Sequence, residues 1–134
     1  MTTFEYAEPA QDVERLLSSA AHAVVGVNRA DQPPQLSVVW FLWDGETFRF
    51  STTRSRAKFR NLRRDPSISV LIDDFDRKFH VVAYGEAELI EGGHAELAQP
   101  LIEKYLPPGQ THNPQWTPDR VIVRFRPDRI LTGR

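Results

Sequence analysis

The stretch from Gln35 to Trp43, QLSVVWFLW, limits the possible folds more than any other part of the sequence. Successive side chains of a strand point to opposite faces, and here both faces are apolar. One face carries Leu36, Val38, Trp40 and Leu42, and the other carries Val39, Phe41 and Trp43. A strand of this kind must be covered on both sides. We expect one face to fill a barrel interior, and the other to be covered by a second subunit or a planar aromatic ligand.

The remainder of the chain alternates short strand patterns with short amphipathic segments. Asp44-Gly45 is a hairpin signal, and Gly85 indicates a bulge or a close approach of two backbones. Strands are expected at 23–27, 35–43, 47–52, 67–72, 79–90 and 121–125, helices at 9–20, 56–64 and 94–105, a turn at 28–34 and an irregular loop at 106–118. These proportions predict one domain over residues 1–134, mainly β with short helices, built as a small six-stranded antiparallel barrel.

Composition excludes several classes of function. The 134 residues include no cysteine, which excludes disulfides, thiolate metal sites and a cysteine nucleophile. The four histidines do not lie at metal-ligand spacing, so we expect no metal. The N-terminal residues do not resemble a signal peptide and no apolar run is long enough to span a bilayer, so we expect a cytoplasmic protein with no membrane partner. A formal net charge of −1 argues against nucleic-acid binding.

One segment combines residues suited to binding an anion. From Phe50 to Pro66 the sequence reads FSTTRSRAKFRNLRRDP, in which hydroxyl residues end a strand and basic residues begin a helix. Hydroxyls, backbone amides and an Arg56/Lys58 pair are what a phosphate group requires. From the residues alone, two other interpretations stay open: a solvated basic helix face, and a surface that follows a nucleic-acid backbone.

Four parts of the chain resemble a known family. They are QPPQLSVVWFLWDGETFRFSTTRSRAKFRNLRRDPSISVLID, VVAYGEAEL, the KY pair in the third expected helix, and RVIVRFRPDRIL. Together they resemble the pyridoxamine-phosphate-oxidase-like split β-barrels, which are the flavin/deazaflavin oxidoreductases. The short, arginine-rich form of the anion-binding segment is most similar to the branch that uses the deazaflavin coenzyme F420. The resemblance extends from about residue 23 to residue 131.

The resemblance implies a homodimer with the cofactor in a groove between subunits. It places the ring along Gln35, Ser37, Val38, Val39 and Trp40, the phosphate-bearing tail at Ser51, Thr52, Arg56, Ala57 and Lys58, and a contribution from the partner around Lys78 and Phe79. The implied activity is hydride transfer from F420 to a conjugated small organic acceptor. The alternatives are an FMN-dependent oxidase or flavin reductase of the same family, and a cofactor-binding protein without catalysis.

Two further features are candidates for substrate contact. His80 begins the strand near the expected groove, although it also suits an ordinary surface histidine. Trp116 lies in the proline-rich loop with His112, Asn113 and Gln115, and we expect it to act as a lid if the loop is functional. No residue stands out as a catalytic acid.

Overall fold

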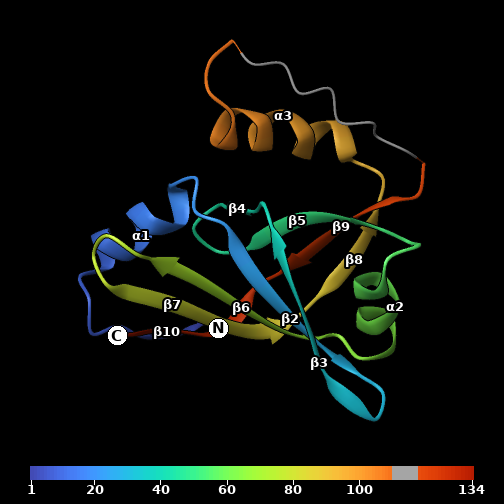
Figure 1. The fold of residues 1–134 in the computed structure, drawn as a ribbon, viewed down its shortest axis with the longest axis horizontal. Coiled ribbons are helices and arrows are strands. Elements are labelled where there is room, and N and C mark those ends of the chain that lie inside the picture. The colour runs from blue at the N-terminus through green and yellow to red at the C-terminus, as the bar shows by residue number, and fades with distance from the viewer. Residues whose placement is uncertain (110–117) are drawn as a thin grey trace.

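The computed structural model describes residues 1–109 and 118–134, and its fold is mainly β with three short helices (Figure 1). The helices are α1 (Ala10–Ser18), α2 (Ala57–Arg64) and α3 (His94–Tyr105). The strands in the described residues are β1 (Thr3–Glu5), β2 (Ala23–Arg29), β3 (Gln32–Val39), β4 (Leu42–Trp43), β5 (Phe48–Thr53), β6 (Ser67–Asp74), β7 (Phe79–Glu86), β8 (Glu88–Glu91), β9 (Arg120–Phe125) and β10 (Pro127–Gly133).

The strands form two separately hydrogen-bonded sheets rather than one closed barrel of six strands. The larger sheet has the order β1-β10-β7-β6-β2-β3 and the smaller has the order β4-β5-β9-β8. Neighbouring strands are antiparallel, except that β1 runs parallel to β10. Figure 1 shows α1 and α2 at opposite ends of the molecule and α3 above the smaller sheet.

Two of the predicted strands are each divided between the two sheets. The strand predicted at 35–43 begins at Gln32 and ends at Val39, and the chain then crosses over Trp40 and Phe41 to β4 in the smaller sheet. The strand predicted at 79–90 is divided at Ala87, whose N–H donates to the Pro66 carbonyl at 2.8 Å instead of continuing a ladder. A single strand that passes from one sheet to another must break its pairing at such a corner.

Other predicted boundaries change for local reasons. The turn predicted at 28–34 is shorter, because β3 includes both prolines and only Ala30 and Asp31 separate it from β2. Asp31 adopts a φ of 55°, which suits a tight turn. The prediction for Gly85 is confirmed as a close approach of backbones, since a Cβ there would lie 3.1 Å from the Arg126 carbonyl oxygen.

The core fills the space between the sheets. It is formed by aromatic residues of the smaller sheet and its crossover, by aliphatic residues of the larger sheet, and by one face each of α1 and α2. A second, smaller cluster of Leu97, Leu101 and Ile122 lies between α3 and the smaller sheet, with Trp40 and Tyr105 packed against it. The four-stranded sheet is therefore covered on one face by the core and on the other by α3.

The described residues contain no helix long and apolar enough to cross a membrane. In the same residues, no three histidine, cysteine or acidic side chains gather as they would around a metal ion.

Candidate functional site

A pocket of about 220 Å³ lies where α3 faces the smaller sheet and the start of α2. Its apolar wall comes from the end of β3 and from α3, and its polar wall comes from β5, α2 and β9. The lining residues are Val38, Val39, Trp40, Ser51, Arg56, Lys58, Ala98, Leu101, Ile102 and Arg120. Three of these carry positive charge, and none of the described lining residues is acidic. The pocket therefore offers an anion-binding end beside an apolar surface.

The start of α2 places two cations at this end. Arg56 is the N-cap residue, with an extended backbone, and Lys58 lies on the first turn. Lys58 is only 6% exposed, and its Nζ donates to the Ser37 hydroxyl at 2.9 Å. Burial, and next the positive charge of Arg56, lower the pKa of Lys58. No carboxylate neutralises Lys58 among the described residues of the pocket, which is unusual for a buried ammonium group.

Two residues that were predicted along the cofactor ring instead contact α2. Ser37 accepts the hydrogen bond from Lys58, and Gln35 Oε1 accepts one from Asn61 Nδ2 at 3.5 Å. Both lie on the face of β3 that turns toward α2, since they alternate with the exposed Leu36 and Val38. They support the cationic end of the pocket rather than line it.

Arg120 is a lining residue that the sequence-based prediction missed. It begins β9 directly opposite Thr53 of β5, and its Nη1 donates to the Ser51 hydroxyl at 3.3 Å. Val121 and Val123 of β9 are fully buried in the core, so their neighbour Arg120 points to the α3 side of the sheet. This alternation, read back from the apolar residues of β9, is the signal in the sequence that locates Arg120.

Besides Gln35 and Ser37, four predicted site residues do not line the pocket of this chain. Thr52 points to the core side of β5, is 1% exposed, and its hydroxyl has no hydrogen-bond partner in the described structure. Ala57 begins α2 but is outside the lining. The other two residues lie at the β6–β7 turn. Lys78 has a φ of 58°, and Phe79 is a core residue that is 3% exposed. That turn is at the opposite end of the molecule from α2 (Figure 1).

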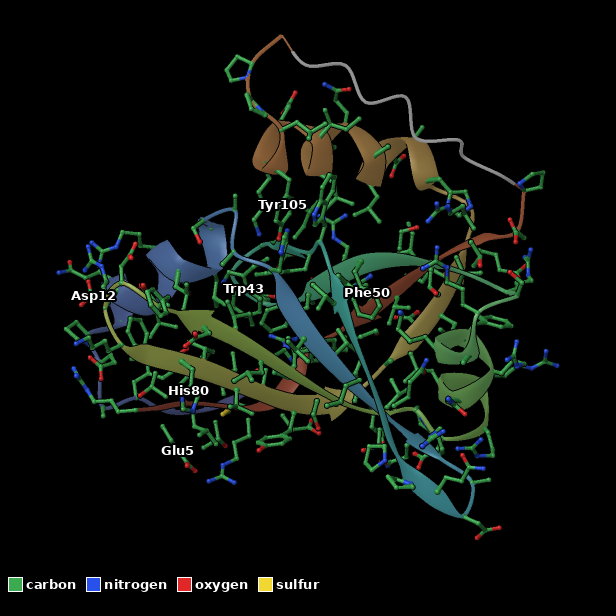
Figure 2. The ribbon with its side chains drawn as sticks, viewed as in Figure 1. Glu5, Asp12, Trp43, Phe50, His80 and Tyr105 are labelled. Atoms are coloured by element: carbon green, nitrogen blue, oxygen red, sulfur yellow. The ribbon has the colours of Figure 1, made fainter. Side chains whose placement is uncertain are left out.

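The apolar wall is held by an aromatic stack between α3 and the crossover after β3. Trp40 stacks on Tyr105 with ring centroids 4.9 Å apart and planes 4° apart, and its Nε1 donates to His22 Nε2 at 3.1 Å. The Tyr105 hydroxyl donates to the Ala21 carbonyl at 2.9 Å and accepts from the Phe41 N–H at 3.1 Å. Figure 2 shows Tyr105 extending from α3 toward the strands. Burial raises the pKa of Tyr105 to about 12, so its hydroxyl stays protonated.

Lys104 fixes the same helix from the neighbouring position. Its Nζ donates to the Leu17 carbonyl at 3.0 Å and to the Phe41 carbonyl at 2.8 Å, and lies 3.7 Å from the centre of the Phe41 ring. Burial lowers the pKa of Lys104 to about 8. The KY pair is thus the attachment of α3 to α1 and to the crossover.

Of the two candidate substrate contacts, only His80 lies in the described part of the chain, and it is not among the residues that line the pocket. His80, labelled in Figure 2, lies on β7 in register with Asp73 and Gly133. A Cβ at Gly133 would lie 2.6 Å from His80 Nε2, so the His80 ring lies directly over this glycine. The prediction of a lid at Trp116, with His112, Asn113 and Gln115, falls on residues 110–117, outside the described part of the chain.

The chain is similar to proteins of one known family and to several solved structures. A family model described as pyridoxamine 5'-phosphate oxidase matches residues 10–132. An F420 reductase structure superposes with a TM-score of 0.78 at 30% identity, covering 87% of this chain and 94% of that chain. A conserved hypothetical protein from Mycobacterium tuberculosis superposes with a TM-score of 0.78 at 25% identity, covering 94% and 84% of the two chains.

A pyridoxamine 5'-phosphate oxidase-related, FMN-binding protein from Nostoc punctiforme has a TM-score of 0.64 at 14% identity, over 92% of this chain and 80% of that one. At that identity the likeness shows the fold alone. The family match and the F420 reductase neighbour indicate a protein of the flavin-binding or oxidoreductase class. By the extent of the family match, the chain belongs to the pyridoxamine 5'-phosphate oxidase family.

Proposed function

We propose that this protein is an oxidoreductase that binds the deazaflavin coenzyme F420 and transfers hydride to a conjugated small organic acceptor. The observation that carries the proposal is the buried Lys58, which has no acidic partner in the described pocket and lies beside Arg56 and Ser51. Burying an unpaired ammonium group is unfavourable, so a site of this kind is best explained by a ligand that brings the missing negative charge.

The residues of the pocket fit the two parts of such a cofactor. Arg56 offers a planar donor fork for two oxygens of a phosphate group, and Lys58 offers a compact point charge. Val38, Val39 and Trp40 offer an apolar surface for a flat ring. Reduced deazaflavin supplies a hydride when bound. The task of this chain is to hold the ring against the end of β3, exclude water with α3, and leave one ring face open to the acceptor.

The choice of F420 over FMN rests on two observations. The F420 reductase is a relative at 30% identity over most of both chains, whereas the FMN-binding neighbour is at 14%. The pocket also gathers three cations, Arg56, Lys58 and Arg120, which suits a tail with several negative charges better than a single phosphate group.

We infer further that the protein works as a homodimer, with two sheets per protomer arranged as a split β-barrel. The outer face of the larger sheet is apolar: in register order, Val38, Val24, Leu71 and Val82 form one row across four strands. Leu36 is 69% exposed and Val38 is 64% exposed. Apolar rows of this size on a single chain are typical of an interface.

Val38 belongs both to this face and to the pocket. A second copy seated on the face would therefore also form a wall of the pocket. The cavity of about 220 Å³ in one chain is small for a three-ring cofactor, because ligand pockets are usually roughly 300–1,000 Å³. The partner would supply the remaining wall.

The proposal is tested by titrating the purified protein with F420 and, in parallel, with FMN. Quenching of deazaflavin fluorescence reports F420 binding, and the flavin absorption band reports FMN. We expect saturable F420 binding that is at least tenfold tighter than FMN binding, and oxidation of reduced F420 by a conjugated acceptor. Tighter FMN binding would assign the protein to the FMN-dependent alternative. F420 binding with no turnover of any acceptor would leave a cofactor-binding protein.

A further inference from the structure

We propose that Arg120 is a positioning residue of this anion site, which acts by turning the Ser51 hydroxyl hydrogen toward the ligand. The inference rests on the proposed binding of a cofactor with an anionic tail, and it adds a residue from β9 to a site otherwise built from β3, β5 and α2. The ligand group concerned is a phosphate or carboxylate, which accepts hydrogen bonds and donates none.

The direction of the hydrogen bond between Arg120 and Ser51 carries the argument. A guanidinium group only donates, so at the 3.3 Å contact Arg120 Nη1 is the donor and Ser51 Oγ is the acceptor. The Ser51 hydroxyl hydrogen must then point elsewhere. No described group of the protein accepts it at hydrogen-bond distance, and Ser51 lines the pocket. The hydrogen is therefore available to an acceptor inside the pocket.

The same pattern is repeated at Ser37. Lys58 is also a donor-only group, and its Nζ donates to Ser37 Oγ at 2.9 Å. Each cation thus fixes one serine hydroxyl as a donor. Ser37 lies behind Lys58 and outside the pocket lining, so the groups that present hydrogens to the pocket are the cations and the Ser51 hydroxyl. Such a set favours a ligand group with several acceptor oxygens, and is unsuited to a cationic or donor-rich ligand.

Strand pairing fixes the backbone positions of Arg120 and Ser51. Arg120 is opposite Thr53, and Ser51 is opposite Ile122, so the four side chains share one face of the smaller sheet. Ile122 lies in the cluster beneath α3 and is 7% exposed. Because both ends of the Arg120–Ser51 contact are anchored on paired strands, the hydroxyl can be oriented before the ligand arrives. A guanidinium group has five N–H donors, so it can serve several acceptors at once.

The test compares each deazaflavin or flavin with its counterpart that lacks the phosphate. Two pairs of ligands are used: F420 with the deazaflavin alcohol that lacks the tail, and FMN with riboflavin. Each ligand is titrated into the wild-type protein and into three variants, Arg120→Gln, Arg120→Lys and Ser51→Ala. We expect Arg120→Gln to weaken binding of the phosphate-bearing form on the order of tenfold, the scale of one charge-assisted hydrogen bond, and to change binding of the phosphate-free form by less than twofold. Arg120→Lys, which keeps a donor, should recover part of the loss.

A double variant shows whether Arg120 acts through Ser51. If it does, Arg120→Gln together with Ser51→Ala weakens binding by less than the product of the two single effects. Arg124→Gln is the matched control, because it removes an exposed arginine from the same strand, outside the pocket. It should leave both affinities unchanged.

The outcomes separate the two proposals. Absence of F420 and FMN binding to the wild-type protein would overturn the proposed function. A second outcome would overturn only the role of Arg120. In it, the wild-type protein binds the cofactor and Lys58→Met weakens that binding, but Arg120→Gln weakens the phosphate-bearing and phosphate-free forms equally. Strictly multiplicative losses in the double variant would overturn the action through Ser51.

Discussion

Replacing Lys58 by methionine separates ligand binding from folding. Methionine has a similar length and fills the same space, but it cannot donate to Ser37 or to an anion. Lys58 is 6% exposed and its pKa is lowered by burial, so the folded protein without ligand holds this charge unfavourably. We therefore expect Lys58→Met to keep or to raise the thermal unfolding temperature of the free protein.

Ligand binding should respond in the opposite direction. The variant loses one charge-assisted hydrogen bond to the anionic tail, about 1.5–3 kcal/mol, which corresponds to about 10- to 150-fold in Kd. The assay is quenching of F420 fluorescence at constant ionic strength, with thermal unfolding measured on the same samples. Arg63→Met is the matched control, because Arg63 is an exposed cation on the same helix and outside the pocket. It should change Kd by less than twofold.

The same residue predicts how binding depends on pH. Because burial lowers the pKa of Lys58 and a bound anion would raise it, binding takes up a proton once the pH passes the lowered pKa. Affinity should therefore fall as the pH rises through that range in the wild-type protein, and fall less in Lys58→Met. An unchanged Kd in Lys58→Met, or a large loss of stability together with tight binding, would refute the reasoning.

Three further predictions concern the parts that surround the site. Leu36→Asp places a charge on the apolar outer face, where Leu36 is 69% exposed, and should convert a dimer into a monomer in analytical ultracentrifugation; a dimer that persists would contradict the proposed interface. Burial lowers the pKa of Lys104 to about 8 from 10.5, so the unfolded state binds more protons between these values. The contribution of Lys104 to the free energy of unfolding should therefore rise as the pH increases from about 8 to 10.5. Urea unfolding of the wild type and of Lys104→Met should show a difference in free energy that increases over the same pH range. A difference that does not change with pH would contradict the prediction. Gly85→Ala brings a Cβ to 3.1 Å from the Arg126 carbonyl oxygen and should cost about 1–3 kcal/mol of stability in urea unfolding, whereas wild-type stability would mean that the two backbones separate easily.

The part of the site that is contiguous in the sequence was predicted best. Ser51, Arg56 and Lys58 do line one pocket, because the end of β5 and the start of α2 are joined by a short turn. Local chemistry, hydroxyls followed by paired cations, is sufficient to indicate such a segment. Thr52 is the exception, since strand alternation sends it into the core while its neighbour Ser51 faces the pocket.

The parts of the site that meet only in three dimensions were missed. Arg120 and the α3 residues Leu101 and Ile102 are far from β5 in the sequence. Alternation in β9 indicates which face of the sheet Arg120 occupies, but no pattern in these segments indicates that the face meets β5 and α2 at a pocket. The crossover after Val39 was missed for a different reason. Trp40 and Phe41 continue an apolar run, so the alternation gives no sign that the backbone leaves one sheet there and enters the other.

The outermost strands carry too little pattern to be recognised. All three residues of β1 are exposed, and β10 contains only Pro127 and Ile130 as buried side chains between polar residues. β10 pairs with the edge of β7, and β1 then pairs with β10, so both strands extend the larger sheet. Sequence periodicity reports burial, and these strands are held mainly by backbone hydrogen bonds.

A crystal structure of the protein with F420 bound is the most direct test of the central claim. We expect the phosphate group within hydrogen-bond distance of Arg56, Lys58 and Ser51, the ring against the end of β3, and a second protomer closing the pocket across the apolar sheet face. A bound cofactor whose phosphate lies away from the start of α2, with Lys58 still facing only Ser37, would contradict it.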